Sequence, residues 1–226
     1  MTMIYTRFYN VKELPFDKPQ ALRYFGCRAE GLSAEAERLF DECVETVFSA
    51  CEGKVCFSEF PIRKAEDGLD LGFTKTNSSS LSRNLAGCEK VVAFAATVGV
   101  GVDRLIARYG ELSADRAYAC QAIGAERIEA LCDAFCADIA KKYQAEGLFV
   151  RPRFSCGYGD FPLEKQRDFF RALDCERKIG LTLNDSLLMS PSKSVTAVVG
   201  AGRGACRPVG DKCAACGKSD CEYRKG

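Results

Sequence analysis

The sequence predicts an α+β domain in which helices pack on an antiparallel or mixed sheet and one long helix dominates. Apolar residues keep one helical face from about Ala114 to Glu146, which corresponds to about nine turns and roughly 50 Å. A continuous apolar run at 91–97 is typical of a strand that is buried on both faces. With 226 residues, 47% of them hydrophobic, the chain can bury a core of its own.

The first element with a clear period is a helix from Ser33 to about Cys51. Its apolar side chains recur at spacings of three and four, and serine is a residue type that caps helix N-termini. Gly53 follows the helix and ends it. Residues 1–31 show no clear period, so no element is predicted there.

A hairpin and a short helix come next. Residues 55–63 and 69–74 are predicted strands around a turn at Asp67-Gly68, because Asp-Gly is a strong hairpin signal. Residues 78–86 are a predicted short helix that stops at a glycine. The apolar run at 91–97 and the long helix follow.

A glycine-punctuated loop at 151–162 leads into an amphipathic helix at 163–173. Residues 178–183 and 195–200 are predicted strands on either side of a turn at 190–193. Two units are therefore expected. Residues 1–200 form the α+β domain, and residues 201–226 form a glycine-rich hinge and a cysteine-rich tail.

Composition excludes several functions. The chain has 32 Lys and Arg against 31 Asp and Glu, so it has no overall field that would attract nucleic acid or an anionic membrane. We therefore expect no nucleic-acid partner. The chain also has no histidine, which excludes Ser-His-Asp and Cys-His catalysis and imidazole metal ligands.

The chain has 14 cysteines. Its N-terminal residues lack the apolar core of a signal peptide, and no stretch approaches the roughly 20 apolar residues of a membrane span. We expect a cytoplasmic protein with free thiols and no membrane association.

Four of these cysteines crowd the tail, and two of them are separated by only two residues. Such spacing lets thiolates share one zinc ion or one iron-sulfur cluster. Nearby lysines and arginines favour the thiolate form. The spacing leaves zinc and iron-sulfur open, and the alternative is a cysteine-rich end without metal. The predicted ligands are Cys206, Cys213, Cys216 and Cys221.

The second candidate site is the loop at 153–160. Arg153 offers a planar fork for a carboxylate, Gly157 permits positive φ and close approach of a ligand, and Tyr158 offers an aromatic face for a cation. The alternative interpretation of such a loop is a tight turn. The polar segment at 183–195, taken alone, is also typical of a loop.

The two segments follow one another in a fixed pattern. The pattern consists of Arg153, Gly157 and Tyr158, then Leu183, Asn184, Asp185, Ser186, Met189, Pro191, Ser194 and Val195. In this order the two segments resemble the S-adenosylmethionine-binding activation domain of cobalamin-dependent methionine synthase. The stretch at 153–166 is closer still to small standalone relatives of that domain. Cys156 stands where the family pattern usually has proline, so the pattern does not determine how rigid the loop is.

The resemblance implies a role in repairing oxidised cobalamin by one electron and a methyl group from S-adenosylmethionine. Because the sulfonium is already activated, this chemistry needs positioning rather than a general base, and we expect no catalytic residue. By similarity, Arg153 would hold the ligand carboxylate and Gly157 would admit the ligand. The implied S-adenosylmethionine-binding set is Arg153, Gly157, Tyr158, Asp185 and Ser186, and the implied cobalamin-facing set is Tyr158, Pro191 and Ser194.

The resemblance also implies partners. Cobalamin would arrive on a methionine synthase that lacks its own activation domain, so that a methyltransferase-type reaction is completed in trans. The electron would come from a donor such as a flavodoxin or ferredoxin, or through a cluster in the tail. The alternatives are reactivation of another corrinoid methyltransferase and a non-catalytic metal-binding adaptor.

Overall fold

A computed structural model describes residues 3–27 and 33–203 and confirms the α+β fold. A six-stranded sheet forms its centre, and every pair of neighbouring strands in it is antiparallel. Its strands are β1 (Tyr5–Tyr9), β2 (Gly53–Pro61), β6 (Lys90–Thr97), β7 (Phe149–Val150), β8 (Phe154–Ser155) and β11 (Ser194–Gly202). Their order is β1, β2, β6 and β11, and both β7 and β8 pair with β11. The chain therefore places β11 in the interior of the sheet.

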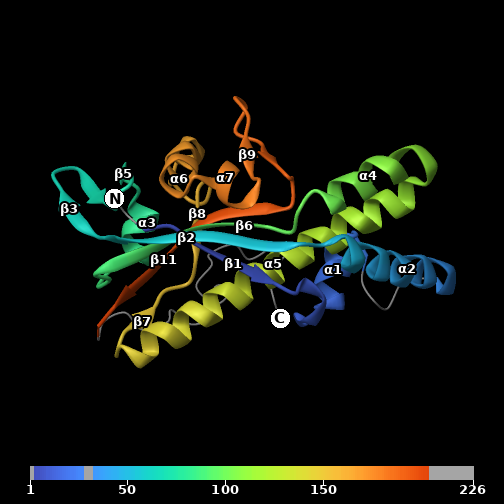
Figure 1. Ribbon diagram of the computed structural model, residues 1–226, viewed down its shortest axis with the longest axis horizontal. Coiled ribbons are helices and arrows are strands. Elements are labelled where there is room, and N and C mark those ends of the chain that lie inside the picture. Colours follow the sequence, from blue (N-terminus) through green and yellow to red (C-terminus); the bar gives the residue numbers. More distant parts are fainter. Residues whose placement is uncertain (1–2, 28–32, 204–226) are drawn as a thin grey trace.

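One face of the sheet packs against the long helix α5 (Ala114–Ala145), which runs along it in Figure 1. Three further helices join this core: α1 (Lys18–Tyr24), α2 (Ala34–Ala50) and α4 (Gly101–Leu112). At its centre, the ring of Phe135 lies 5.1 Å from that of Phe57 and 4.8 Å from that of Phe94. The predicted long helix is confirmed to within one residue at its C-terminal end.

The other face packs against α3 (Ser79–Asn84), α6 (Gln166–Leu173) and α7 (Cys175–Ile179). In Figure 1 α6 and α7 lie above the sheet, while α5 lies below it. Within β6, Val92 and Phe94 belong to the α5 core, whereas Val91 and Ala93 belong to the α6 core. This alternation explains why the run at 91–97 is apolar throughout: both faces of the strand are covered.

Short elements complete the chain. A turn at Glu66 and Asp67, one residue earlier than predicted, joins β3 (Arg63–Ala65) to β4 (Gly68–Asp70), so the predicted strand at 69–74 is confirmed only at its first two residues. The strand β5 (Lys75–Thr76) pairs with β4. A second hairpin is formed by β9 (Thr182–Leu183) and β10 (Met189–Ser190). Two 3-10 turns, η1 (Val11–Glu13) and η3 (Leu163–Lys165), precede α1 and α6.

The N-terminal segment, for which the sequence predicted no element, is fixed by a buried arginine of α5. The Arg127 guanidinium is 0% exposed and donates hydrogen bonds to the carbonyl oxygens of Val11, Leu14 and Pro15 at 3.2, 3.1 and 2.6 Å. Glu126 neutralises it at 2.6 Å. Burial of this charge is tolerated because its donors have partners. The segment therefore owes its path to a tertiary contact rather than to a local pattern.

The predicted strand at 178–183 is wrong in its first half. Residues 178 and 179 end helix α7, and only Thr182 and Leu183 are in a strand. Cys175 and Ile179 are both buried, one helical turn apart, and Gly180 adopts φ +69° and ends the helix. Helix α4 also lies in a stretch for which the sequence predicted no element.

No helix within residues 3–27 and 33–203 is long and apolar enough to cross a membrane. The tail beyond residue 203, with its four cysteines, lies outside the described residues. The expected division at residue 200 therefore stays a prediction, although β11 continues to Gly202 as part of the main sheet.

Candidate functional site

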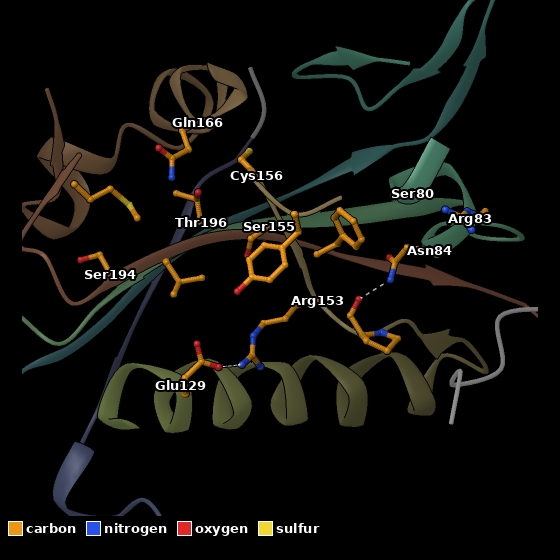
Figure 2. A pocket seen from close by; sticks show the side chains of 15 residues that line it. Ser80, Arg83, Asn84, Glu129, Arg153, Ser155, Cys156, Gln166, Ser194 and Thr196 are labelled. Carbon is orange, nitrogen blue, oxygen red and sulfur yellow. Dashed lines mark hydrogen bonds and ion pairs between the residues drawn. The ribbon is translucent and has the colours of Figure 1, made fainter. Parts of the chain in front are cut away.

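A cavity of about 650 Å³ opens among α5, the loop after β7, α3, the start of α6 and the first residues of β11 (Figure 2). Both motif segments singled out in the sequence reach it. Its walls are formed by Ser80, Arg83, Asn84, Glu129, Pro152, Arg153, Phe154, Ser155, Cys156, Tyr158, Gln166, Met189, Ser194, Val195 and Thr196.

Arg153 and Glu129 form the charged side of this cavity, as Figure 2 shows. The guanidinium pairs with Glu129 and with Asp133, which lie one turn apart on α5. The side chain of Arg153 is 13% exposed, whereas those of Glu129 and Asp133 are 36% and 71% exposed. Two charge-assisted pairs hold the planar guanidinium in one orientation. A fixed cation and a fixed anion therefore lie side by side at the cavity wall.

The loop that carries Arg153 is anchored to the beginning of α3 by Asp160. Its carboxylate accepts hydrogen bonds from the Ser78 hydroxyl at 2.5 Å and from the backbone N–H groups of Ser79 and Ser80 at 2.8 and 3.0 Å. These hydrogen bonds hold the pKa of Asp160 well below its usual range. The carboxylate thus stays ionised and keeps the loop against the helix at any physiological pH.

Two glycines shape the same loop. Gly159 has φ +56°, and a Cβ there would lie 2.6 Å from the Ser80 Oγ, so no side chain fits. Gly157 has φ +85°, and its N–H donates to the carbonyl of Phe161 at 2.9 Å. Gly157 thus adopts the positive φ that the sequence allowed for it, and Gly159 does the same. The loop is thereby tightly held although Cys156 replaces the usual proline.

Tyr158 and Cys156 contribute very different surfaces. Tyr158 is 68% exposed at the cavity, which leaves most of its ring available to a second molecule. Cys156 is buried in the wall, and burial raises the pKa of its thiol to about 12. At neutral pH this thiol is protonated and is therefore not a nucleophile.

The second motif segment reaches the cavity only near its C-terminal end. Met189 and Ser194 line the cavity, whereas Asp185 and Ser186 lie exposed at the tip of the β9–β10 hairpin. Pro191 is buried and does not line the cavity, but its carbonyl accepts the Ser194 hydroxyl hydrogen bond at 2.8 Å. The structure therefore brings Arg153, Tyr158 and Ser194 together and leaves the hairpin tip apart from them.

Three polar atoms of the cavity wall have no hydrogen-bond partner among the residues that the structure describes. They are the Asn84 Oδ1, the Gln166 Oε1 and the Thr196 Oγ1. The Asn84 amide is oriented by its Nδ2, which donates to the Pro152 carbonyl at 3.2 Å. Buried polar atoms without partners are costly, so they mark where a ligand would complete the hydrogen bonding.

Sequence reasoning missed several of these lining residues, among them Glu129, Asn84, Gln166 and Thr196. Gln166 falls within the stretch at 153–166 that carries the family resemblance, so a signal for it was present. Thr196 directly follows the second motif. Nothing in the local pattern distinguishes Glu129 or Asn84 from solvent-facing residues of their helices, because only the fold brings them to the loop.

Within the described part of the chain, no group of three or more Cys, Asp or Glu side chains is arranged to hold a metal ion. The predicted metal ligands Cys206, Cys213, Cys216 and Cys221 all lie outside that part. The metal prediction therefore concerns the tail alone.

Comparisons with known proteins identify the family and support the fold. The family described as the activation domain of vitamin B12 dependent methionine synthase matches residues 82–208, which include every cavity-lining residue except Ser80. A solved structure described as the MetH reactivation domain bound to AdoHcy superposes with a TM-score of 0.66, at 16% sequence identity, covering 88% of this chain and 78% of that one. At this identity the likeness concerns the fold. No curated protein sequence matches the chain.

Proposed function

Because the chain belongs to the family of vitamin B12-dependent methionine synthase activation domains, we propose that it binds S-adenosylmethionine in the cavity and supports the reactivation of cobalamin carried by a partner protein. The observation that carries this proposal is the paired charge at the cavity wall. The cavity, at about 650 Å³, also lies within the range of about 300–1,000 Å³ typical of small-molecule sites.

The charged side of the cavity matches the zwitterionic amino-acid group of S-adenosylmethionine. The ligand carboxylate binds Arg153, and its ammonium binds Glu129. Asp133 is the replaceable partner of Arg153, because its side chain is 71% exposed and returns to water when the ligand carboxylate arrives. The less exposed Glu129 stays in place. The exchange therefore leaves no charge both buried and unpaired.

The chain's own contribution to the chemistry is positioning. The reduced corrinoid of the partner is the methyl acceptor: its cobalt, after one-electron reduction, takes the methyl group from the sulfonium, and S-adenosylhomocysteine is released. No proton moves in this step, which agrees with a chain that has no histidine. Tyr158, exposed at the cavity, faces the corrinoid in this proposal, together with Ser194 and the adjacent Pro191 turn.

The partner we propose is a cobalamin-carrying methionine synthase that lacks its own activation domain, and the electron donor is a flavodoxin or ferredoxin. The alternative partner is another corrinoid methyltransferase. Gly157, Asp185 and Ser186 remain predicted ligand residues. Gly157 is already in the loop, but Asp185 and Ser186 would need the β9–β10 hairpin to move toward the cavity.

Titration calorimetry of the full chain with S-adenosylmethionine and with S-adenosylhomocysteine tests the binding step. Saturable binding of both at one site is expected. Absence of binding would overturn the proposal and favour the non-catalytic adaptor. Methyl transfer to chemically reduced cobalamin on each candidate partner then separates the methionine synthase from the other corrinoid methyltransferases.

We also propose that the tail binds a metal through Cys206, Cys213, Cys216 and Cys221, as zinc or as an iron-sulfur cluster. Anaerobic purification with metal analysis and an absorption spectrum identifies the metal. The double variant Cys213→Ser, Cys216→Ser is expected to lose it while S-adenosylmethionine affinity is unchanged. Stoichiometric metal in this variant would rule the site out. A cluster would in addition be needed for cobalamin reduction by a protein donor, whereas a zinc site would not.

A further inference from the structure

We propose that Gln166 and Thr196 form a second, neutral end of the cavity that reads a 6-aminopurine, so that these two residues determine the nucleobase specificity of the site. The inference rests on the function proposed above, because it assumes that the charged end holds an amino-acid group. The inference adds the orientation of the ligand in the cavity and the two side chains that select its nucleobase.

Burial identifies the neutral end. Gln166 is 6% exposed and Thr196 is 2% exposed, and both line the cavity. Neither the Gln166 Oε1 nor the Thr196 Oγ1 has a hydrogen-bond partner among residues 3–27 and 33–203. A buried acceptor without a partner costs free energy in the unliganded protein. Two such atoms in one wall therefore indicate where the polar groups of a ligand can complete the hydrogen bonding.

The two ends of the cavity are supplied by opposite layers of the fold. Gln166 begins α6 and Thr196 lies in β11, and Figure 2 shows their side chains close together beneath α6. Arg153 and Glu129 lie together beside α5, which packs on the other face of the sheet. An elongated ligand with one charged and one neutral end therefore has a single favoured orientation.

The chemistry of the neutral end favours a purine with a 6-amino group. An amide oxygen requires an N–H donor, and the edge of adenine places such a donor beside a ring nitrogen that accepts. A glutamine side chain matches this pair bidentately. The hydroxyl of Thr196 can donate or accept as the base requires. The soft side chains of Cys156 and Met189, also in the wall, provide polarisable contacts for a flat ring.

The experiment uses an uncharged probe, 5′-methylthioadenosine, which lacks the amino-acid group and so tests the neutral end alone. Its dissociation constant is compared with that of the purine riboside counterpart in which hydrogen replaces the 6-amino group. Both are measured on the full chain and on Gln166→Met, a variant of similar length that removes the amide. Gln144→Met, at an exposed position of α5, is the matched control.

The wild-type chain and Gln144→Met are expected to bind the 6-amino compound about tenfold or more tightly than its counterpart, because the missing N–H leaves a buried acceptor unpaired. In Gln166→Met this preference is expected to fall to within about twofold. Thr196→Val, a second variant of nearly the same shape, is expected to reduce the preference as well and guards against a folding defect in the first.

Three outcomes would overturn the inference. If the wild type binds S-adenosylmethionine but shows no preference between the two probes, the neutral end does not read the amino group, and the proposed function stands. If the preference persists in both variants, the base is read elsewhere, for example by the Asn84 Oδ1. If the wild type binds neither S-adenosylmethionine nor 5′-methylthioadenosine, both the inference and the proposed function fail.

Discussion

The two sequence segments that carry the family resemblance meet the cavity in different ways. The loop at 153–160 is fixed from several sides: Asp160 binds the start of α3, and Arg153 binds two carboxylates of α5. The β9–β10 hairpin has an exposed tip, and the Asn184 Oδ1 accepts a hydrogen bond from the Leu188 N–H at 2.9 Å within the hairpin itself. The first segment is held by side-chain contacts to α3 and α5, whereas the tip of the second is held by its own turn bonds and by one hydrogen bond from the Arg167 guanidinium of α6 to the Asp185 carbonyl at 3.0 Å.

This difference shows that polar residues in a motif are not equivalent. In the first segment, the polar side chains themselves enter the site or lock the loop that forms it. In the second, the polar tip lies apart, and the cavity is lined instead by Met189 and by Ser194 and Val195, where β11 begins. A segment can therefore be characteristic of a family because of where it directs the following strand, while its most polar residues remain in solvent.

The largest effect on ligand binding is expected from Arg153→Ala. Loss of a charge-assisted hydrogen bond should weaken S-adenosylmethionine binding by about 1.5–3 kcal/mol, or roughly 10- to 150-fold. Calorimetric titration measures the change. Arg151→Ala is the matched control, because Arg151 is in the same loop but donates to the Ala86 carbonyl and does not line the cavity. Equal affinities of both variants and the wild type would remove the loop from the site.

An intermediate effect is expected from Asp160→Asn, which keeps the side-chain shape but removes the charge that binds α3. S-adenosylmethionine affinity should fall by less than in Arg153→Ala, because the Gly157 and Phe161 turn bonds remain. Asp67→Asn, in the exposed β3–β4 turn, should leave the affinity unchanged. A loss equal to that of Arg153→Ala would mean that the loop has no other support.

The same variant has a pH signature. The folded-state pKa of Asp160 lies well below the unfolded value of about 3.9. The stabilising contribution is therefore fully present above pH 3.9 and is lost only as the pH falls through the lower folded-state pKa. The stability difference between the wild type and Asp160→Asn, measured by chemical denaturation, should stay constant from pH 7 to about pH 5. A difference that declines within that interval would show that the carboxylate is not held in its ionised form.

The smallest effect is expected from Asp185→Ala. With the hairpin tip apart from the cavity, Asp185 is an exposed side chain, and such substitutions usually change free energies by less than about 0.5 kcal/mol, so S-adenosylmethionine affinity should change by no more than about twofold. A tenfold loss would instead show that the hairpin tip reaches the bound ligand, in agreement with the ligand-binding role that the family resemblance implies for Asp185 and Ser186. The comparison between the two segments would then hold only for the unliganded protein.

Much of the fold could be predicted because its signals are local. The long helix needs only its own periodic apolar face, and the strand at 91–97 needs only an unbroken apolar run. The N-terminal segment could not be predicted, because the buried Arg127 that fixes it lies more than a hundred residues away. The false strand at 178–183 arose because short apolar segments do not distinguish a helical turn from a strand.

The residues of the site also differ in whether a local sequence pattern identifies them. Arg153 and Tyr158 could be identified because they belong to one recognisable loop. Glu129 could not, because only the packing of α5 against that loop gives a helical glutamate a role. Gln166 lies in the motif stretch at 153–166, and Thr196 directly follows the second motif. That both side chains are buried without a hydrogen-bond partner is a property of the folded protein, so their place in the site could not be predicted from their neighbours in sequence.

The interior position of β11 has a consequence for how the protein is made. Its pairing partner β6 is about a hundred residues earlier in the chain, and β11 is the last strand of the described part. During synthesis the N-terminal elements leave the ribosome first. The nascent chain therefore contains α5 and the strands β1, β2 and β6 before β11, to which β7 and β8 pair, has been made. Ser194 and Thr196 emerge with that last strand, and the cavity is finished only then. The cavity therefore cannot bind a ligand until translation has passed β11 and this strand has paired with β6.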